Sequence, residues 1–501
     1  MVSRRFRYGL VLCVLAGLSW VGQGHTQTPE LHYKGRALPE WRNDLGNGSP
    51  EIRQRAVEAF GSFGPQAVPV LLEALKSSDP NVRQAAILSL GAIVPVQKDA
   101  VLAIVPAMNG PDPVTRQAAT ALWTQGGLKA KVGRDLVLAL AEDLKKDNPE
   151  VRRRAIEALV EIRSGEKEAV QSLADALQDT ERGMREKAAL ALGEIGPQAK
   201  EAVPALLQAL RDKEPAVRRM TVHALGLIGT KAKDVVAAVT EALQDAQAII
   251  RQEAAQTLGK FGVEAKAAAP ALVLALKDAD AEVRGHAAYA LGLIGPAAKH
   301  ASPALGQALK DVSAFVRGKA AHALGLIGQA SKDTVSALVQ ALRDNDEGVR
   351  MGAASALGRI GPPAQESVPA LVQALNDSHT GVRQEAARAL GKIGSPTGES
   401  VLALVQALRD ADVSTREAAA KALGAIGPAH KDAIPSLIQL LKDTAADIRK
   451  SGAKALGEIG PAAQEAIPAL KEMLQDADVD VRKAAAEALS RVDQALGPGE
   501  G

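Results

Sequence analysis

The sequence contains a single cysteine, Cys13, which excludes an intramolecular disulfide framework and a cysteine-based metal site. Aromatic residues make up 2% of its 501 residues, whereas apolar residues make up 47%, with Ala, Leu and Val in the majority. This mixture favours many short, closely packed helices over sheets, which use β-branched and aromatic residues. Neither sign of charge is in large excess, because 60 Lys and Arg stand against 58 Asp and Glu. We therefore expect neither a nucleic-acid-binding surface nor an anionic-membrane-binding surface.

Motifs of the common catalytic and nucleotide-binding sites are also missing. The chain has no GxGxxG, GxxxxGK, GxSxG or HExxH. Alternating acids such as Asp476, Asp478 and Asp480 could ligate Ca²⁺, but helix capping and contacts between repeats explain their spacing without a metal. We expect no cofactor and no metal. These absences favour a non-catalytic protein and leave enzymatic activity open.

The N-terminal segment has the pattern of a signal peptide over residues 1–24. Three arginines within the first seven residues precede a mostly apolar run over 9–21, and glycines follow at 22 and 24. The alternative is an uncleaved anchor, which the shortness of the run disfavours. Cleavage would remove Cys13 and leave no membrane span. We therefore expect a periplasmic or secreted protein.

The rest of the chain repeats one unit fourteen times. Each copy contains an arginine at the same place in the pattern, and the spacings are 30, 33 and 36 residues and then 33 ten times. A fixed period of this length indicates a solenoid and not a series of globular domains. Copies one to fourteen are numbered here by Arg53, Arg83, Arg116, Arg152, Arg185, Arg218, Arg251, Arg284, Arg317, Arg350, Arg383, Arg416, Arg449 and Arg482.

Each copy predicts two helices. Apolar residues at offsets −1, +3, +7 and +10 from the arginine form the stripe of a second helix, which ends at a glycine at +11. The following segment predicts the first helix of the next copy. It carries a recurrent proline, such as Pro204, at which the helix either kinks or begins after one loose turn. A glycine at +8, such as Gly193, costs about 1 kcal/mol of helix propensity, so its recurrence indicates close helix–helix approach.

The chain resembles the HEAT-repeat family, and more narrowly its repeats of the phycobilisome-lyase (PBS lyase) type. The resemblance rests on the 33-residue period and on the recurring motifs VR, ALGxIGP and VPALLxAL. The resemblance implies an all-α, right-handed α-solenoid of about fourteen helix pairs over residues 38–493. Residues 25–37 would form an N-terminal linker and 494–501 a flexible tail. Trp41 resembles part of an N-terminal cap. Copy four departs from the pattern, with Val160 and Arg163 in place of the two glycines, and we expect a weaker joint there.

The resemblance also implies a ladder between neighbouring copies, formed by an aspartate in the turn between helices and the repeat arginine. An aspartate stands six residues before the arginine in ten consecutive copies, whereas the first four copies lack it. We expect a weaker ladder toward the N-terminus. The predicted structural residues are Asp179, Arg185, Asp212, Arg218, Asp245, Arg251, Asp278, Arg284, Asp311, Arg317, Asp344, Arg350, Asp377, Arg383, Asp410, Arg416, Asp443, Arg449, Asp476 and Arg482.

HEAT-repeat enzymes offer a competing function. Deoxyhypusine hydroxylase binds iron through His-Glu dipeptides, but none of the eight histidines of this chain precedes a glutamate. Bilin lyases share the repeat type and modify a thiol on their substrate, although export fits that cytoplasmic role poorly. A lyase-like or oxidoreductase-like protein therefore remains an alternative, as does a structural envelope spacer.

The second helices of copies six, eight and nine differ from the others at offsets that lie outside the apolar stripe. Most copies place charged residues or Gln at +1, +2, +5 and +9, on the helices that line the concave face of HEAT-like solenoids. Neutral drift at tolerant surface positions would explain the difference, but an exposed apolar and aromatic patch also marks recognition sites. We expect an exported scaffold that binds a protein or an extended peptide in its concave groove, with its oligomeric state open. The candidate binding residues are Met220, His223, Leu227, His286, Tyr289, Leu293, His322 and Leu326.

Overall fold

The computed structural model describes residues 32–93, 96–124, 132–229, 232–329, 331–394, 397–427 and 431–493. The predicted signal peptide, residues 25–31 of the predicted linker and the predicted tail lie outside these ranges. The chain divides into two compact units, Met1–Ala139 and Leu140–Gly501, named unit 1 and unit 2 below. The division falls within the first helix of copy four.

Unit 1 begins with two short antiparallel strands, β1 (His32–Tyr33) and β2 (Arg36–Ala37), within the segment expected to be a linker. The Trp41 indole donates to the carbonyl oxygen of Tyr33, so the strands pack against the first helix. The helices that follow are α1 (Leu38–Asp44), α2 (Pro50–Phe63), η1 (Gly64–Ala67), α3 (Val68–Ala74), α4 (Pro80–Ala92), α5 (Lys98–Ala107) and α6 (Pro113–Thr124), and α7 (Arg134–Asp143) contains the division between the units.

Unit 2 continues with alternating first and second helices, of which several first helices follow a short 3₁₀ helix. They are α8 (Pro149–Ile162), α9 (Lys167–Ala176), α10 (Arg182–Ile195), η3 (Gly196–Ala202), α11 (Val203–Ala209), α12 (Pro215–Ile228), α13 (Lys233–Glu241), η4 (Ala242–Gln244), α14 (Ala248–Phe261), η5 (Gly262–Ala268), α15 (Ala269–Ala275), α16 (Ala281–Ile294), η6 (Gly295–Ala301), α17 (Ser302–Ala308), α18 (Ala314–Ile327), α19 (Lys332–Ala341), α20 (Glu347–Ile360), η7 (Pro362–Ser367), α21 (Val368–Ala374), α22 (Thr380–Ile393), α23 (Gly398–Ala407), α24 (Val413–Ile426), η8 (Lys431–Ala433), α25 (Ile434–Leu440), α26 (Ala446–Ile459), η9 (Gly460–Ala466), α27 (Ile467–Met473) and α28 (Val479–Asp493).

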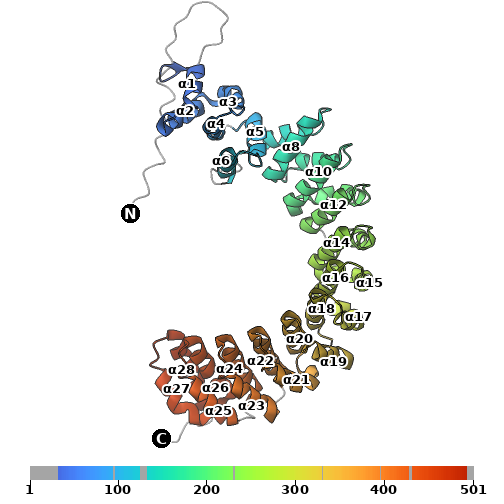
Figure 1. The fold of residues 1–501 in the computed structure, drawn as a ribbon, viewed down its shortest axis with the longest axis vertical. Coiled ribbons are helices and arrows are strands. Elements are labelled where there is room, and N and C mark those ends of the chain that lie inside the picture. The colour runs from blue at the N-terminus through green and yellow to red at the C-terminus, as the bar shows by residue number, and fades with distance from the viewer. Residues whose placement is uncertain are drawn as a thin grey trace, which may run out of the picture. The chain divides into compact units, whose positions relative to one another are not determined.

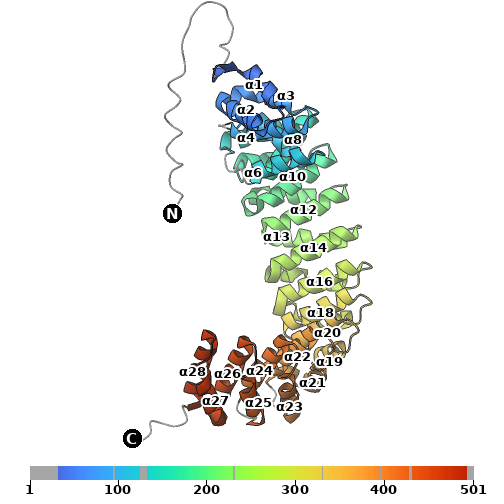
Figure 2. The ribbon, with the colours of Figure 1, turned by 60° about the vertical axis from the view of Figure 1, so that its left-hand side comes forward.

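Within the described residues these α-helices form fourteen pairs, which confirms the predicted all-α solenoid. Even-numbered helices are the second helices, and within each unit every one of them packs on the next, as α14, α16, α18 and α20 do. Figure 1 shows these second helices along the inner side of unit 2, with α15, α17, α19 and α21 along its outer side. Figure 2 shows the same succession from another direction.

The apolar stripe of each second helix forms the core. In α16, Val283, Ala287, Leu291 and Ile294 are buried, at the predicted offsets −1, +3, +7 and +10. The Asp280 side chain accepts hydrogen bonds from the first N–H groups of this helix and so fixes its start. Small and aliphatic side chains thus fill the space between helices, as the composition predicts.

The recurrent proline begins the first helix and does not kink it. Pro204 lies in the first turn of α11, directly after the 3₁₀ helix η3. Its missing N–H costs nothing there, because the first N–H groups of a helix have no partner within it. The structure therefore selects the second of the two alternatives.

Glycine at +11 ends the second helices with positive φ. Gly229 has φ 71° and ψ 12°, a left-handed C-cap, whereas Gly196 has φ 72° and ψ −140° and leads directly into a 3₁₀ helix. Copy four has Arg163 at this place, with φ 56° and ψ 43°. A non-glycine residue in this conformation stores strain, and it does so in the copy expected to be a weak joint.

Candidate functional site

The repeat arginines of unit 2 from Arg152 to Arg449 each join their own copy to the next. Arg185 Nε donates to Asp212 Oδ2 at 2.6 Å and its Nη2 to Oδ1 at 3.0 Å, while Nη1 donates to the carbonyl oxygen of Asp179 at 2.9 Å. The arginine thus contacts the backbone of its own copy and the carboxylate of the following one. The same ion pair recurs in Arg152–Asp179, Arg218–Asp245, Arg251–Asp278, Arg284–Asp311, Arg317–Asp344, Arg350–Asp377, Arg383–Asp410, Arg416–Asp443 and Arg449–Asp476.

These aspartates also hold the backbone of their own turn, since Asp212 Oδ1 accepts from the N–H of Glu214 at 2.8 Å. The hydrogen bonds from Arg251 lower the pKa of Asp278 against the opposing effect of burial, and those from Arg317 do the same for Asp344. Bidentate, charge-assisted pairs of this kind lock the relative position of two helices. The ladder therefore holds the second helices in register.

A different aspartate completes a rung in unit 1. Arg83 Nη2 lies 2.8 Å from Asp112 Oδ2, although Asp112 stands four residues before its arginine and not six. Hydrogen bonds from Thr115 and then from Arg83 lower the pKa of Asp112 to about 2. An N-capping aspartate thus replaces the turn aspartate that the first copies lack.

A second series of contacts links neighbouring copies on the exposed side of the second helices. It joins the residue at +5 of one copy to the residue at +2 of the next, 30 positions along the chain. The pairs are Glu157 with Lys187, His223 with Glu253 at 2.9 Å, Gln256 with His286 at 3.0 Å, and Tyr289 with Lys319, whose ammonium lies 4.7 Å from the ring centroid. We call these pairs the +5/+2 contacts. Copies five and six have Leu190 and Met220 at these offsets and no such polar contact. Between copies nine and ten the series ends, because Gly352 at +2 has no side chain that could reach His322 at +5.

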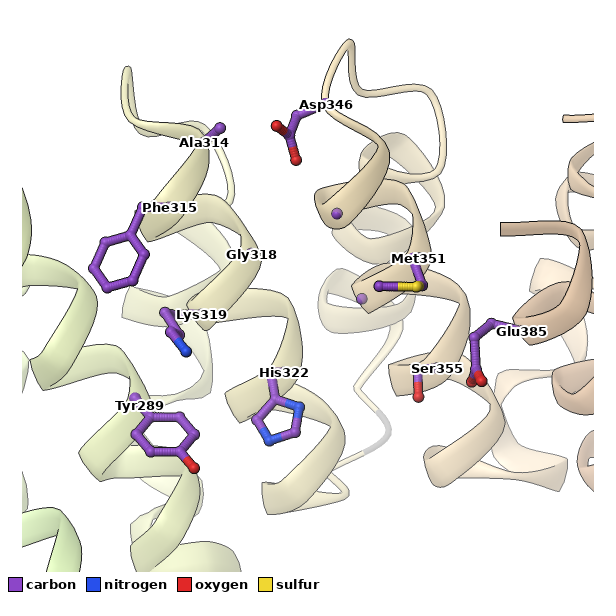
Figure 3. Close-up of a pocket in the computed structure, with 12 residues that line it drawn as sticks. Tyr289, Ala314, Phe315, Gly318, Lys319, His322, Asp346, Met351, Ser355 and Glu385 are labelled. Atoms are coloured by element: carbon purple, nitrogen blue, oxygen red, sulfur yellow. The ribbon is translucent and has the colours of Figure 1, made fainter. Parts of the chain in front are cut away.

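A pocket of about 640 Å³ opens at this interruption, between α16, α18, α20 and α22. Figure 3 shows Tyr289, Phe315 and Lys319 on one side of His322, and Met351, Ser355 and Glu385 on the other. Asp346, Ala314 and the glycines 318, 348 and 352 complete the wall. The pocket lies on the inner side of unit 2, where the sequence predicts a binding groove.

Aromatic rings form one wall of the pocket. The Tyr289 and His322 rings stack with centroids 5.8 Å apart, and Phe315 meets the edge of His286 at 5.7 Å. Gly285 makes room for Phe315, because a Cβ at that glycine would clash with the phenyl ring. Lys319 lies over the Phe315 ring as well as the Tyr289 ring, at 5.5 Å. Its charge is therefore held at the pocket wall by cation–π contacts.

Burial sets the charge state of the two histidines beside these rings. It lowers the pKa of His286 and that of His322, and in His322 the neighbouring Arg359 and Lys319 lower the pKa further. His322 is consequently a neutral imidazole at pH 7. Among the described residues its ring nitrogens have no hydrogen-bond partner, whereas those of His223 and His286 do.

The eight predicted binding residues do not form one surface. Tyr289 and His322 line the pocket, and His286 supports Phe315 from behind. Met220 and His223 belong to copy six and lie outside it. The three leucines at +9 have a packing role, since their Cδ1 atoms approach the +8 glycine of the preceding copy, and they are Leu227, Leu293 and Leu326.

Phe315 is not among the predicted binding residues, because it stands at offset −2, outside the four offsets at which the copies differ. Its signal in the sequence is its rarity, since the chain has five phenylalanines. In the structure Phe60, Phe63 and Phe261 are buried, whereas Phe315 is partly exposed. Lys319 and Glu385 look like ordinary surface charges in the sequence. The described residues contain no cluster of three or more His, Cys, Asp or Glu placed to hold a metal ion. No helix among them is long and apolar enough to cross a membrane.

A family profile described as HEAT repeats matches residues 38–123, 136–213, 203–292, 269–340, 302–366, 335–403 and 401–490. The chain belongs to the HEAT-repeat family. No curated protein matches it significantly. Solved HEAT-repeat structures do resemble it, and two of them belong to importins.

The structure titled for Kap95p binding to RanGDP has a TM-score of 0.54 and 14% identity, over 93% of this chain and 73% of that one. Importin beta crystallised in an ammonium sulfate condition has a TM-score of 0.52 and 18% identity, over 92% and 68% of the two chains. At this identity the likeness shows the fold alone, a HEAT-repeat solenoid.

Proposed function

We propose that this HEAT-repeat protein is a non-catalytic scaffold that binds a protein or an extended peptide on the face of its second helices. The observation that carries this proposal is the pocket at Tyr289, Phe315 and His322. Partly exposed aromatic side chains are rare among the residues that the structure describes, and here they line a hollow on the inner side of unit 2. Aromatic residues in a partly apolar pocket are typical anchors for a peptide side chain. The importin-like structure titled for RanGDP binding shows that a solenoid of this type holds a protein partner, which supports the proposal.

Selection from a displayed library of random dodecapeptides tests this function. The wild-type chain should enrich peptides that no longer bind when Tyr289 and Phe315 are both changed to Ala. A matched control changes two exposed apolar residues of first helices, Leu274→Ala and Leu402→Ala, which are 68% and 61% exposed. The control should retain the peptides. Peptides that bind both double variants equally, or no enrichment at all, would reject this face as the binding surface, and the second result would favour a structural spacer.

Export to the periplasm or the exterior is part of the same proposal and rests on the signal-peptide pattern of residues 1–24. Intact-mass measurement of the chain from envelope and secreted fractions should find a start at residue 25. The competing functions predict a bound chromophore for a lyase-like protein, to which the narrower PBS-lyase resemblance would lead, and a bound metal for an oxidoreductase-like protein related to deoxyhypusine hydroxylase. Absorbance spectra and metal analysis of the purified chain check for these directly.

A further inference from the structure

We infer that the pocket takes a carboxylate, in an acidic peptide segment whose neighbouring side chains are apolar. This inference rests on the proposed function and names the chemistry of the ligand. It follows from comparing two junctions of the same chain, one of which holds a carboxylate of its own and one of which does not.

The junction of copies six and seven provides the template. The Nδ1–H of His223, at +5, donates a hydrogen bond to the carboxylate of Glu253, at +2 of the next copy, with 2.9 Å between Nδ1 and Oε1. The Glu253 side chain is only 12% exposed, so the contact is shielded from water. A histidine at this offset is thus satisfied by a carboxylate that reaches it from the following helix.

The junction of copies nine and ten has the same histidine and lacks the carboxylate. His322 stands at +5, and Gly352 occupies the position that corresponds to Glu253. The space that a glutamate would fill is part of the pocket. A ligand carboxylate in that space would meet the His322 imidazole and the Lys319 ammonium, which both line the pocket. No ion pair joins Lys319 to an acid of this chain within the ranges that the structure describes, so its charge is available to a ligand.

The two acids of the pocket are engaged elsewhere and do not supply the missing group. Glu385 Oε1 lies 2.6 Å from Arg388 Nη1 on its own helix. Asp346 caps α20, where its Oδ1 accepts from the N–H of Val349 at 3.0 Å. Arg359 adds a further positive charge close to His322. Lys319 and Arg359 therefore make the His322 side of the pocket positive, and a negative charge is complementary there.

Apolar surface beside these cations defines the rest of the ligand. Phe315 lies on one side of Lys319, and Met351, which is 39% exposed, forms the opposite wall. A peptide with apolar side chains on either side of an acidic residue would cover Phe315 and Met351 together. The shared chemistry, a carboxylate beside an apolar group, also exists at a peptide C-terminus, and the experiment separates the two sources.

Binding of synthetic peptides tests the inference. The probe is acetyl-Gly-Ser-Leu-Glu-Leu-Ser-Gly-amide, and its matched control carries Gln in place of Glu. A second pair is acetyl-Gly-Ser-Gly-Ser-Leu with a free carboxylate or a terminal amide. We expect the Glu peptide to bind about tenfold or more tightly than the Gln peptide, and to shift the ring signals of His322 but not those of His223 in NMR spectra of the histidine-labelled chain. A preference only for the free C-terminal carboxylate would overturn the acidic side chain as the source.

Variants of the chain itself make the test sharper. Gly352→Glu restores the missing contact from within, and a Cβ at this glycine meets only ordinary contacts, 3.5 Å from Ala321 Cβ, so the fold tolerates it. Gly352→Glu should weaken binding of the Glu peptide about tenfold or more, whereas Gly352→Ala should leave that binding unchanged. Lys319→Met should weaken the Glu peptide and leave the Gln peptide unchanged. Glu253→Gln, at the template junction, should change neither.

Equal binding of the Glu and Gln peptides, or full binding by Gly352→Glu, would overturn the inference. The peptides selected from the displayed library distinguish failure of the carboxylate inference from failure of the proposed scaffold function. Enriched peptides that depend on Tyr289 and Phe315 but have no acidic residue would leave the scaffold function standing and reject the carboxylate. If no peptide bound this face, both the scaffold function and the carboxylate inference would be rejected.

Discussion

Replacement of a single +8 glycine by alanine should loosen the solenoid at one chosen junction. In α22, a Cβ built on Gly391 would lie 2.8 Å from Ala422 Cα and 2.9 Å from Ala422 Cβ in α24. Neither atom can rotate away, because one is backbone and the other is fixed to it. Ordinary contacts begin near 3.4 Å, so the two helices must separate by about 0.6 Å.

The magnitude follows from two opposing effects. Overpacking of a close interface costs about 1–3 kcal/mol, while Gly→Ala in a helix returns about 1 kcal/mol of propensity. The difference is about 0–2 kcal/mol, so we expect Gly391→Ala to lower the free energy of unfolding by about 1 kcal/mol. Gly306→Ala in α17 is the matched control, because nothing lies within 4 Å of its Cβ, and it should raise stability by up to about 1 kcal/mol.

Urea unfolding followed by circular dichroism measures both variants, and hydrogen exchange locates the effect. In a solenoid each repeat contacts only its neighbours, so α22 and α24 should exchange faster while α10 and α12 do not change. Gly391→Ala with the same or a higher midpoint than the wild type would refute close approach as the reason for the +8 glycine. A uniform increase in exchange would refute the local coupling.

Three further predictions concern the ladder and the joint in copy four. Arg317→Ala leaves the Asp344 carboxylate without its ion-pair partner and should lower the free energy of unfolding, measured in urea, by about 2–3 kcal/mol. Arg482→Ala should lower it less, because Arg482 contacts only carbonyl oxygens among the described residues. Equal losses in the two variants would contradict a stabilising role of the ladder. Arg163→Gly should raise the free energy of unfolding by about 1 kcal/mol by removing left-handed strain, despite the loss of the exposed Arg163–Glu194 pair, and a lower melting temperature would disprove this. The free energy of unfolding should be level from about pH 7 to 8. It should fall modestly between about pH 6.5 and 5, because burial lowers the pKa of His286 and His322 and the unfolded chain therefore binds protons at these histidines first. It should fall further below about pH 4, because hydrogen bonds from arginine lower the pKa of six ladder aspartates, so that the unfolded chain binds protons before the folded chain does. Stability that is independent of pH from 6 to 3 would show that these pairs contribute little.

Much of the fold can be predicted from one repeat. The stripe at −1, +3, +7 and +10 predicts which side of α16 is buried, because helical periodicity is a local property. The close approach at Gly391 is also predictable, since a glycine that recurs inside a helix must gain something for its cost. Whether the helix kinks at Pro204 or begins there is not predictable, because both arrangements accommodate the missing N–H of proline.

The candidate site is less predictable for a physical reason. Tyr289 and His322 stand out as unusual side chains at exposed offsets, but Lys319 looks like any surface lysine until its position over two rings is known. Leu293 looks like part of the patch, yet its Cδ1 atom packs near Gly259 of the copy before it. Contacts at the junctions join residues about 30 positions apart, and their partners depend on how the second helices stack.

The sequence by itself determined the repeat, its helix pairs and the place of each cap, because these depend on neighbours within a few residues along the chain. Only the tertiary structure decided which arginine pairs with which aspartate, and that Gly352 leaves His322 without the carboxylate that His223 has. A missing side chain leaves no mark on its own helix. Its consequence, an open pocket beside His322, Lys319 and the apolar side chains of Phe315 and Met351, exists only where neighbouring copies pack together.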